Sequence, residues 1–313
     1  MEEFKNRVFG CVVVKAINSN YNADFSGQPR TLPSGTVYAT DKAFKYTVKN
    51  YLKDVYKNDK IFYFKSLNEN LNPISLDETY KKLFGDYPVG TVKSKDILKQ
   101  VVAKNLLECL DIRLFGATFA GVTNISLHGP VQVNHGVNIW KENSIYTEQI
   151  TSPFSNKSKD ANADREMTTI GRQSKLEEGH YLHHFSINPQ NLCDIVRIAG
   201  EGSKTLSMDD ISKLKEAMRR GVTWYDSASK AGCENEMLVW VQLNDNSKIV
   251  LPNFTNLIEL KQEKSDNKSV YNFAMLKEQL SGVSSEIEAI EVFYNKQTTK
   301  LEDLPENVTT IEI

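Results

Sequence analysis

The chain has 313 residues, with 38 lysines and arginines against 40 aspartates and glutamates, and a formal charge of −2. At 40 % hydrophobic and 10 % aromatic residues it can bury a sizeable core, which excludes wholesale disorder and a disulfide-stapled miniprotein. No apolar run approaches the ~18 residues of a membrane span, and Glu2 and Glu3 stand where a signal peptide would be basic, so we expect a cytoplasmic protein with no membrane partner.

The predicted elements begin with a buried strand over residues 8–17, which are rich in β-branched side chains. A long polar loop follows over residues 18–35, and loops of this length in compact domains are usually functional or disordered. A helix then begins at Thr40 or Asp41 and runs to about Tyr56. Its buried face is predicted from apolar residues at helical spacing, namely Phe44, Val48, Tyr51, Leu52 and Val55.

The rest of the chain continues the alternation of strands and helices. Residues 57–110 read as an insertion that contains a helix near 95–110, and the region after residue 245 is acidic. Further strands are predicted at 112–120, 129–134, 179–187 and 237–243, and a further helix at 207–220. This order predicts an α+β fold that resembles a ferredoxin-like βαββαβ unit with large insertions.

Four lysines form a stripe on the first predicted helix: Lys42, Lys45, Lys49 and Lys53. Their spacing places them within an arc of roughly 80°, beside the apolar face. Like charges at this spacing repel by a few tenths of a kcal/mol, and a phosphate backbone would remove that repulsion and release counterions. The stripe therefore indicates a nucleic-acid contact, and the alternative is an ordinary solvated face.

The loop before this helix carries polar and aromatic side chains suited to RNA. Tyr21 and Phe25 could stack on bases, and Asp24 could act as an acid or a metal ligand. Donors for phosphates or sugars are Asn18, Asn20, Asn22, Gln28 and Arg30. The alternative is a polar turn region in which asparagine is chosen for its backbone tolerance.

Residues 139–178 form a long polar segment between two predicted strands, which suggests a protruding hairpin that engages partners or nucleic acid. Its basic residues include Lys141, Lys157, Lys159, Arg165, Arg172 and Lys175. The alternative is a mobile surface loop.

Three histidines follow at positions 180, 183 and 184. On a strand, His180 and His184 share a face but lie about 13 Å apart, too far for one metal ion without a kink. We therefore expect neither a metal site nor a cofactor. Motifs of P-loop enzymes, serine hydrolases and zinc proteases do not occur.

Seven short motifs, in this order along the chain, resemble those of the CRISPR-associated RAMP superfamily, and more specifically the major backbone subunit of a type I-B Cascade surveillance complex. The motifs cover about residues 7–245. They are Asn-Tyr-Asn-Ala-Asp (20–24), Gln-Pro-Arg (28–30), Thr-Asp-Lys-Ala-Phe-Lys (40–45), Asp-Ile-Arg-Leu-Phe-Gly-Ala (111–117), Gly-Pro-Val-Gln (129–132), Thr-Ile-Gly-Arg (169–172) and Ser-Lys-Ala-Gly (229–232).

The resemblance implies an RRM-like palm with a finger insertion and a thumb hairpin. The palm would comprise residues 1–56, 110–138 and 179–245. The finger insertion would be residues 57–109 and the thumb residues 139–178, with residues 246–313 as an acidic extension packed on the palm. Such a subunit binds crRNA, polymerises head to tail with further copies of itself and with other Cascade subunits, and meets target DNA through the guide in antiviral defence.

The resemblance and the residue pattern together nominate the contacts to RNA. Lys42, Lys45 and Lys49 would bind phosphates, while Asn20, Asn22 and Arg30 would line the path of the strand. The remaining candidates are Arg113 and Gln132 on the palm, Thr169, Arg172 and Lys175 on the thumb, and Lys230. Backbone contacts of this kind need no base-specific code, so we expect a scaffold and not an enzyme.

Two alternatives stay open. Type III relatives in the same superfamily cleave target RNA with an aspartate in the first loop, where Asp24 lies, so the chain could be an RNA endonuclease. It could also be a stand-alone RRM-like RNA-binding protein. Magnesium-dependent cleavage would distinguish the first alternative, and the absence of a long, uniform co-purifying RNA would distinguish the second.

Overall fold

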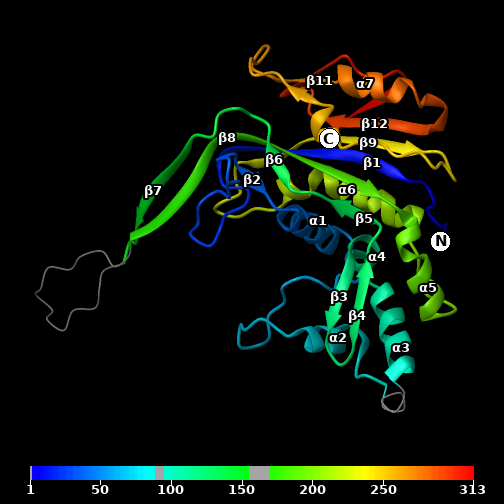
Figure 1. The fold of residues 1–313 in the computed structure, drawn as a ribbon. Coiled ribbons are helices and arrows are strands. Elements are labelled where there is room, and N and C mark those ends of the chain that lie inside the picture. The colour runs from blue at the N-terminus through cyan, green and yellow to red at the C-terminus, as the bar shows by residue number, and fades with distance from the viewer. Residues whose placement is uncertain (1, 89–94, 155–169) are drawn as a thin grey trace, which may run out of the picture.

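The computed structural model describes residues 2–88, 95–154 and 170–313 (Figure 1). Within these residues the largest sheet, here called the main sheet, has nine strands in the order β14-β12-β9-β1-β8-β6-β2, with β5 and β7 also paired to β8. Its strands are β1 (Val8–Ser19), β2 (Tyr38–Ala39), β5 (Val131–Val133), β6 (Gly136–Asn138), β7 (Ile145–Thr151), β8 (Ile170–Ile187), β9 (Cys233–Leu243), β12 (Ile287–Tyr294) and β14 (Val308–Glu312).

The remaining strands form two smaller sheets. One consists of β3 (Gly116–Ala120) and β4 (Asn124–His128), and the other of β10 (Glu259–Leu260), β11 (Ser269–Asn272) and β13 (Thr299–Glu302). The helices are α1 (Asp41–Val55), α2 (Leu76–Phe84), α3 (Lys95–Leu107), α4 (Leu110–Phe115), α5 (Cys193–Ala199), α6 (Met208–Trp224) and α7 (Ala274–Ser281). No helix in the described part of the chain is long and apolar enough to cross a membrane.

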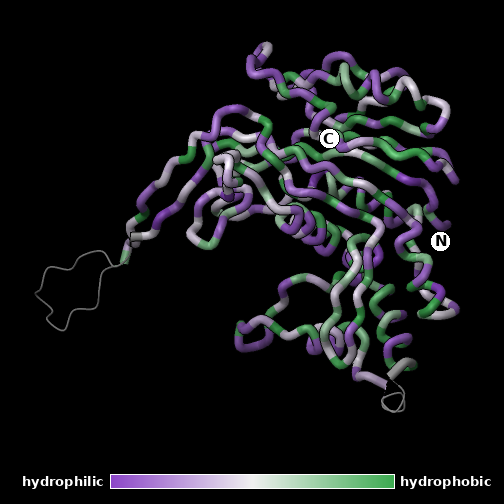
Figure 2. Tube along the Cα trace, in the orientation of Figure 1, coloured by the Kyte–Doolittle hydropathy of each residue, from purple (hydrophilic) through white to green (hydrophobic). Residues whose placement is uncertain are grey.

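The central strand β1 is buried on both faces, which explains its nearly unbroken apolar sequence. Val12 and Val14 belong to the core beneath α1 and α6, whereas Cys11 and Val13 belong to the core beneath residues 246–313, the C-terminal segment. Both neighbours, β8 and β9, run antiparallel to β1. In Figure 2 the hydrophobic colour runs through these central strands. The predicted strand at 8–17 is therefore confirmed.

Helix α1 confirms the predicted helix and most of its buried face. The side chain of Thr40 caps its first turn by accepting from the N–H of Ala43. Phe44, Val48, Tyr51 and Leu52 are buried as predicted, but Val55 at the end of the helix is 38 % exposed. The predicted helix at 207–220 is α6, which runs four residues further and begins with a capping box between Ser207 and Asp210.

The predicted strand at 112–120 is wrong in its first half. Residues 110–115 form α4, and a strand begins only at Gly116, whose φ of +80° ends the helix. A Cβ there would lie 2.2 Å from the carbonyl oxygen of Leu127, and one on Gly129 would lie 2.2 Å from the nitrogen of Gly116. These two glycines let the backbone segments around residues 116 and 129 come into contact. Among the described residues, β3 and β4 pair only with each other.

The described part of residues 57–128 therefore forms an insertion lobe, longer than the predicted insertion at 57–109. Its core includes Phe62, Tyr80 and Val102, together with Phe119 of β3 and Leu127 of β4. Residues 117–127, expected in the palm, pack here instead. In Figure 1 this lobe lies below α1, and the C-terminal segment covers the opposite side of the molecule.

A hairpin leaves the main sheet where one was predicted. Strand β7 pairs with residues 170–176 at the start of β8, from Thr151↔Ile170 to Ile145↔Leu176. We call this paired region the arm, and Figure 1 shows it projecting from the body of the molecule. The side chains of β7 are mostly exposed. The arm thus contributes little to the core of its own subunit.

The histidines on β8 follow the predicted alternation. His183 stacks on Phe44 of α1, whereas His180 and His184 contact Tyr271 and Phe254 of the C-terminal segment. His180 and His184 therefore share a face. No cluster of histidine, cysteine, aspartate or glutamate suited to a metal ion occurs among the described residues.

Candidate nucleic-acid interface

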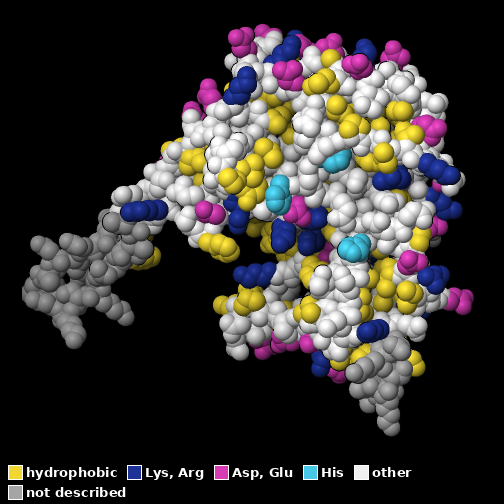
Figure 3. Space-filling view, in the orientation of Figure 1, with side chains coloured by type: hydrophobic (Ala, Val, Ile, Leu, Met, Phe, Trp, Pro, Cys, Tyr) yellow, Lys and Arg dark blue, Asp and Glu magenta, His cyan; other side chains and the backbone are white. Residues whose placement is uncertain are grey.

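The lysine stripe of α1 faces the insertion lobe. The Nζ atoms of its last three lysines each lie over an aromatic ring of that lobe: Lys45 over Phe115 at 5.7 Å, Lys49 over Tyr63 at 5.9 Å and Lys53 over Phe64 at 4.8 Å. In Figure 3, Lys and Arg side chains gather in the hollow between the main body and the lobe. The stripe is thus one wall of a cationic and aromatic hollow, and not an isolated solvated face.

The four lysines differ in their surroundings. Lys42 is exposed, and Lys45 is held 3.1 Å from Asp41, whose other carboxylate oxygen lies 3.6 Å from His135. Lys49 is more enclosed, and burial lowers its pKa, opposed by the nearby carboxylate of Asp111. The exposed lysines of the stripe are therefore Lys42 and Lys53 at its two ends, and Lys53 pairs with Asp54 at 3.1 Å.

A buried carboxylate explains why the rings of Tyr63 and Phe64, here called the aromatic wall, lie opposite α1. The two oxygens of Asp111 accept hydrogen bonds of 2.8 Å from the backbone N–H groups of Phe62 and Tyr63. Burial raises the pKa of Asp111, and these two N–H groups and Lys49 act in the opposite direction. Asp111 thus fixes the segment that places Tyr63 and Phe64 over the lysines.

The side chains of Asn20 and Asn22, in the loop before α1, form hydrogen bonds within the fold. Asn20 is 2 % exposed and donates to the carbonyls of Gly27 and Ser174, at 3.1 Å each. The side-chain oxygen of Asn22 accepts from the N–H and hydroxyl of Thr40, both at 3.0 Å, at the start of α1. The structure thus places both amides as braces for the loop, and does not place Asn20 on an exposed path.

Arg30 and Gln132 keep accessible side chains. Arg30 donates from Nε to the carbonyl of Ala23 and lies 6.0 Å from the ring of Phe25, which is fully exposed. Gln132 is exposed on β5 and donates to the carbonyl of Gly129. Both side chains therefore remain accessible to solvent.

Arg113 lies in the interior, contrary to the expectation of RNA contact, and Lys230 is half-buried. Arg113 is 3 % exposed and forms a two-point ion pair with Asp210, with distances of 2.7 and 3.0 Å. The ammonium of Lys230 donates to the carbonyl of Tyr21 and lies over the same ring, and burial lowers its pKa. The guanidinium of Arg113 is engaged by three such bonds and the ammonium of Lys230 by one, so both cations contribute to the fold.

On the arm, Arg172 is exposed and Lys175 pairs with Glu148 at 3.2 Å across the two strands. Thr169 lies outside the described residues, as do Lys157, Lys159 and Arg165. Of the two basic residues in the described part of the arm, Arg172 is therefore the one with an exposed side chain and no ion pair to a described carboxylate.

Asp24 is held in a turn of its own loop. Its Oδ1 accepts from the hydroxyl and N–H of Ser26 at 2.7 and 2.8 Å and from the N–H of Gln28 at 2.9 Å. The bond from the Ser26 hydroxyl is the main cause of the lowered pKa of Asp24. This arrangement is that of an Asx turn.

Sequence reasoning missed the aromatic wall. The signal was the aromatic run Phe62, Tyr63, Phe64, which is flanked by the basic Lys60 and Lys65. Lys60 itself lies over the ring of Phe84 at 4.6 Å. Alternating cations and aromatics are typical of surfaces that bind single-stranded nucleic acids.

Comparison with known proteins agrees with this description. Residues 6–278 match the family described as CRISPR-associated protein Cas7. No curated protein matches the sequence. Two solved structures share the fold. A chain of a "CRISPR RNA-guided surveillance complex, pre-nicking" is 12 % identical, with a TM-score of 0.57, and the match covers 98 % of this chain and 96 % of that chain. A chain of a "CRISPR RNA-guided surveillance complex" is 13 % identical, with a TM-score of 0.50 and coverage of 94 % and 95 %. Because the family match spans most of its length, the chain belongs to the CRISPR-associated protein Cas7 family.

Proposed function

We propose that this chain is the crRNA-binding backbone subunit of a type I-B Cascade complex. The observation that carries the proposal is the row of α1 lysines over aromatic rings, at the edge of a hollow. Copies would stack head to tail along the guide, each holding its backbone, while base pairing between guide and target reads the DNA sequence. Membership of the family and the shared fold of surveillance-complex chains support the proposal.

The topology supports an RRM-like palm within this subunit. The strand order β9-β1-β8-β5, with the chain order strand, helix, strand, strand, helix, strand, is that of a ferredoxin-like unit. The helices α1 and α6 pack on one face of it. The insertion lobe would act as the finger and the arm as the thumb.

A stand-alone RRM-like protein is less well supported. Such a module presents an open sheet face whose aromatics stack on bases. Here the face opposite α1 and α6 is covered by the C-terminal segment, where Phe254, Tyr271 and Leu276 pack against Phe9 and Val13. RNA bound to this chain would have to use the hollow beside α1 instead.

Replacing Lys42, Lys45 and Lys49 together by alanine is expected to weaken RNA binding regardless of RNA sequence. The slope of log affinity against log salt concentration should flatten by about one unit for each phosphate that no longer has a lysine beside it. Binding titrations at several salt concentrations measure this. The matched control removes the same charge from exposed positions of the C-terminal segment, Lys277, Lys296 and Lys300, and should leave the slope unchanged. Equal slopes for the two triple variants would return the stripe to an ordinary solvated face.

We propose further that the subunit is a scaffold without nuclease activity. A hydrolytic metal ion needs several hard ligands, and Asp24 uses Oδ1 to hold its own turn. The assembled complex with magnesium is expected to leave target RNA intact, and Asp24→Ala to change nothing in a gel-based cleavage assay. Cleavage by the wild type that Asp24→Ala abolishes would instead support the type III-like endonuclease.

A further inference from the structure

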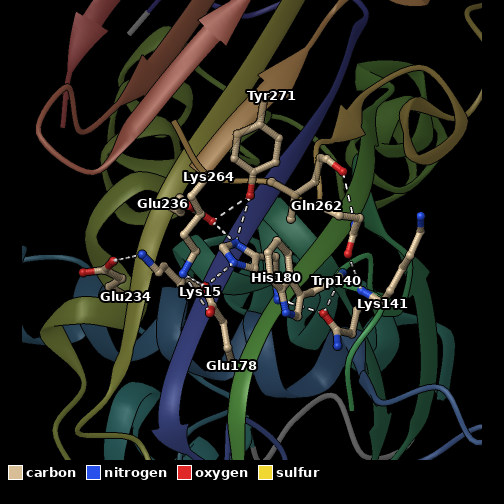
Figure 4. A network of polar contacts seen from close by, with 12 residues as sticks. Lys15, Trp140, Lys141, Glu178, His180, Glu234, Glu236, Gln262, Lys264 and Tyr271 are labelled. Carbon is tan, nitrogen blue, oxygen red and sulfur yellow. Dashed lines mark hydrogen bonds and ion pairs between the residues drawn. The ribbon is translucent and has the colours of Figure 1, made fainter. Parts of the chain in front are cut away.

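A buried cluster of charged and polar side chains connects β8 and β9 of the main sheet with β11 of the C-terminal segment (Figure 4). The imidazole of His180 on β8 lies between two carboxylates. Its Nδ1 is 2.6 Å from Glu236 on β9, and its Nε2 is 3.1 Å from Glu178 on β8. The hydroxyl of Tyr271 on β11 donates to the same Glu236 oxygen at 2.7 Å. His180, Glu236 and Tyr271 are each at most 1 % exposed.

This geometry suits an imidazolium, because both ring nitrogens face carboxylate oxygens. A neutral imidazole has one N–H, so one of its nitrogens would turn a lone pair toward a carboxylate. Burial opposes the charge, but Glu236 and Glu178 outweigh it and raise the pKa of His180. The hydrogen bond from His180 is in turn the largest cause that lowers the pKa of Glu178, to about 2. The cluster is a carboxylate–imidazolium–carboxylate bridge.

The bridge lies where the arm joins the main sheet. Pairing of β6 with β8 ends at Asn138↔Tyr181, and pairing of β7 with β8 begins at Ile145↔Leu176. Residues 139–144 and 177–180 between these points form the joint of the arm. They share few backbone hydrogen bonds, among them Ile139 N–H to the His180 carbonyl and Glu177 N–H to the Ser144 carbonyl. On its other edge β8 is paired with β1 through the joint, from Lys15↔His180 to Ser19↔Leu176, so side-chain contacts matter chiefly for residues 139–144.

The C-terminal segment contacts both sides of the joint, residues 139–144 and residues 177–180 of β8. Lys264 lies 2.7 Å from Oε1 of Glu178 and 5.5 Å from the ring centre of Trp140. The side-chain oxygen of Gln262 accepts from the N–H of Lys141 at 3.1 Å. With Tyr271 on the bridge, residues 262–271 thus hold the joint from one side.

The end of β1 and the loop that follows it hold the arm from another side. Asn20 donates to the carbonyl of Ser174, and the hydroxyl of Tyr146 donates to Asn18 at 3.1 Å. These contacts fall beyond the joint, on the paired part of the arm. The arm is therefore supported at two separate points along its length.

We propose that the C-terminal segment is a brace that fixes the direction of the arm, through the His180 bridge and Lys264. The proposal deepens the proposed function and rests on it, because an arm that reaches a neighbouring copy must leave each subunit at the same angle. The contacts that form the brace lie within one subunit, so the isolated subunit is tested first.

Hydrogen exchange of the full-length subunit tests the brace. Lys264→Met keeps an apolar stem over Trp140 but removes the ion pair to Glu178. Amides of the joint and the arm should exchange about two- to fivefold faster, as expected for loss of a partly exposed pair. The matched control is Lys261→Met, which removes an ion pair to Glu302 within the C-terminal segment and should leave arm exchange unchanged. Wild-type exchange in Lys264→Met would overturn the brace.

Chemical probing of the guide in the assembled complex separates the brace from the proposed function. Arg172→Ala leaves the joint intact, so it should alter guide protection at subunit boundaries without faster arm exchange. Lys264→Met should alter both. Faster exchange with unchanged guide protection supports the brace and overturns the role of the arm on the guide. Unchanged exchange overturns the brace whatever the guide pattern.

Discussion

Replacing Arg113 by methionine is expected to lower the free energy of unfolding by about 3–5 kcal/mol, because it leaves the carboxylate of Asp210 buried without its counter-charge. Asp210 is 1 % exposed and caps α6, the helix that packs on α1. The third hydrogen bond of Arg113, from Nη1 to the carbonyl of Leu107 at 2.9 Å, would also disappear. Urea unfolding followed by circular dichroism measures the change.

Two comparisons make this expectation specific. Arg197→Met removes an exposed pair with Asp194, 72 % and 87 % exposed, and should change stability by less than about 1 kcal/mol. An equal, small loss of stability in Arg113→Met and Arg197→Met would contradict the stabilising role of the buried pair. Under conditions where Arg113→Met stays folded, the salt slope of RNA binding should match the wild type. A slope flatter by about one unit would place Arg113 on a phosphate after all.

Replacing His180 by glutamine is expected to cost about 3–5 kcal/mol near neutral pH, because Glu236 would remain buried without a cation beside it. Three side chains contact His180 directly: Glu178 on β8, Glu236 on β9 and Tyr271 on β11. Lys15 on β1 acts on it through Glu236, and Lys264, in the loop before β11, acts through Glu178. Thermal or urea unfolding measures the loss.

The same bridge predicts a pH dependence with a definite sign. The pKa of His180 is raised in the folded state, so its stabilisation is complete below the unfolded value of about 6.5 and is lost as pH rises through the folded value. The pKa of Glu178 is lowered to about 2, so its stabilisation is present above about pH 4.5 and is lost as pH falls. The bridge contributes most between these limits.

A series of unfolding curves above pH 6.5 tests this sign. Stability of the wild type should decline with rising pH more steeply than that of His180→Gln. His184→Gln is the control, because burial lowers the pKa of His184 and its ring is neutral throughout this range. Parallel pH profiles for wild type and His180→Gln would contradict the imidazolium bridge.

The core elements could be predicted from local sequence patterns. The β-branched run of β1 and the helical spacing of Phe44, Val48 and Leu52 on α1 depend on neighbours in sequence, and both are confirmed. The same reasoning failed at residues 110–115. There, polar Asp111 and Arg113 are buried because partners far along the chain satisfy them, so the short helix shows no solvated face.

The candidate site divides in the same way. The lysine stripe follows from α1 alone, because helical spacing decides which side chains share a face. The aromatic rings opposite it could not be paired with it from sequence. The segment that carries Tyr63 and Phe64 is held by contacts with residues far along the chain, among them the hydrogen bonds to Asp111.

By itself, the sequence determined the type and place of the main helices and strands, the family resemblance and the cationic face of α1, because periodicity and ordered motifs are local properties. Only the tertiary structure decided which polar side chains remain accessible at the surface. Asn20, Arg113 and Lys230 look like binding residues in the sequence, yet each meets a partner inside the fold. Arg113 and Asp210 are 97 positions apart, and only the packing of α4 against the start of α6 brings them to 2.7 Å. A buried charge is stable only beside such a partner, so the fold, and not the residue type, decides which cations are free to bind.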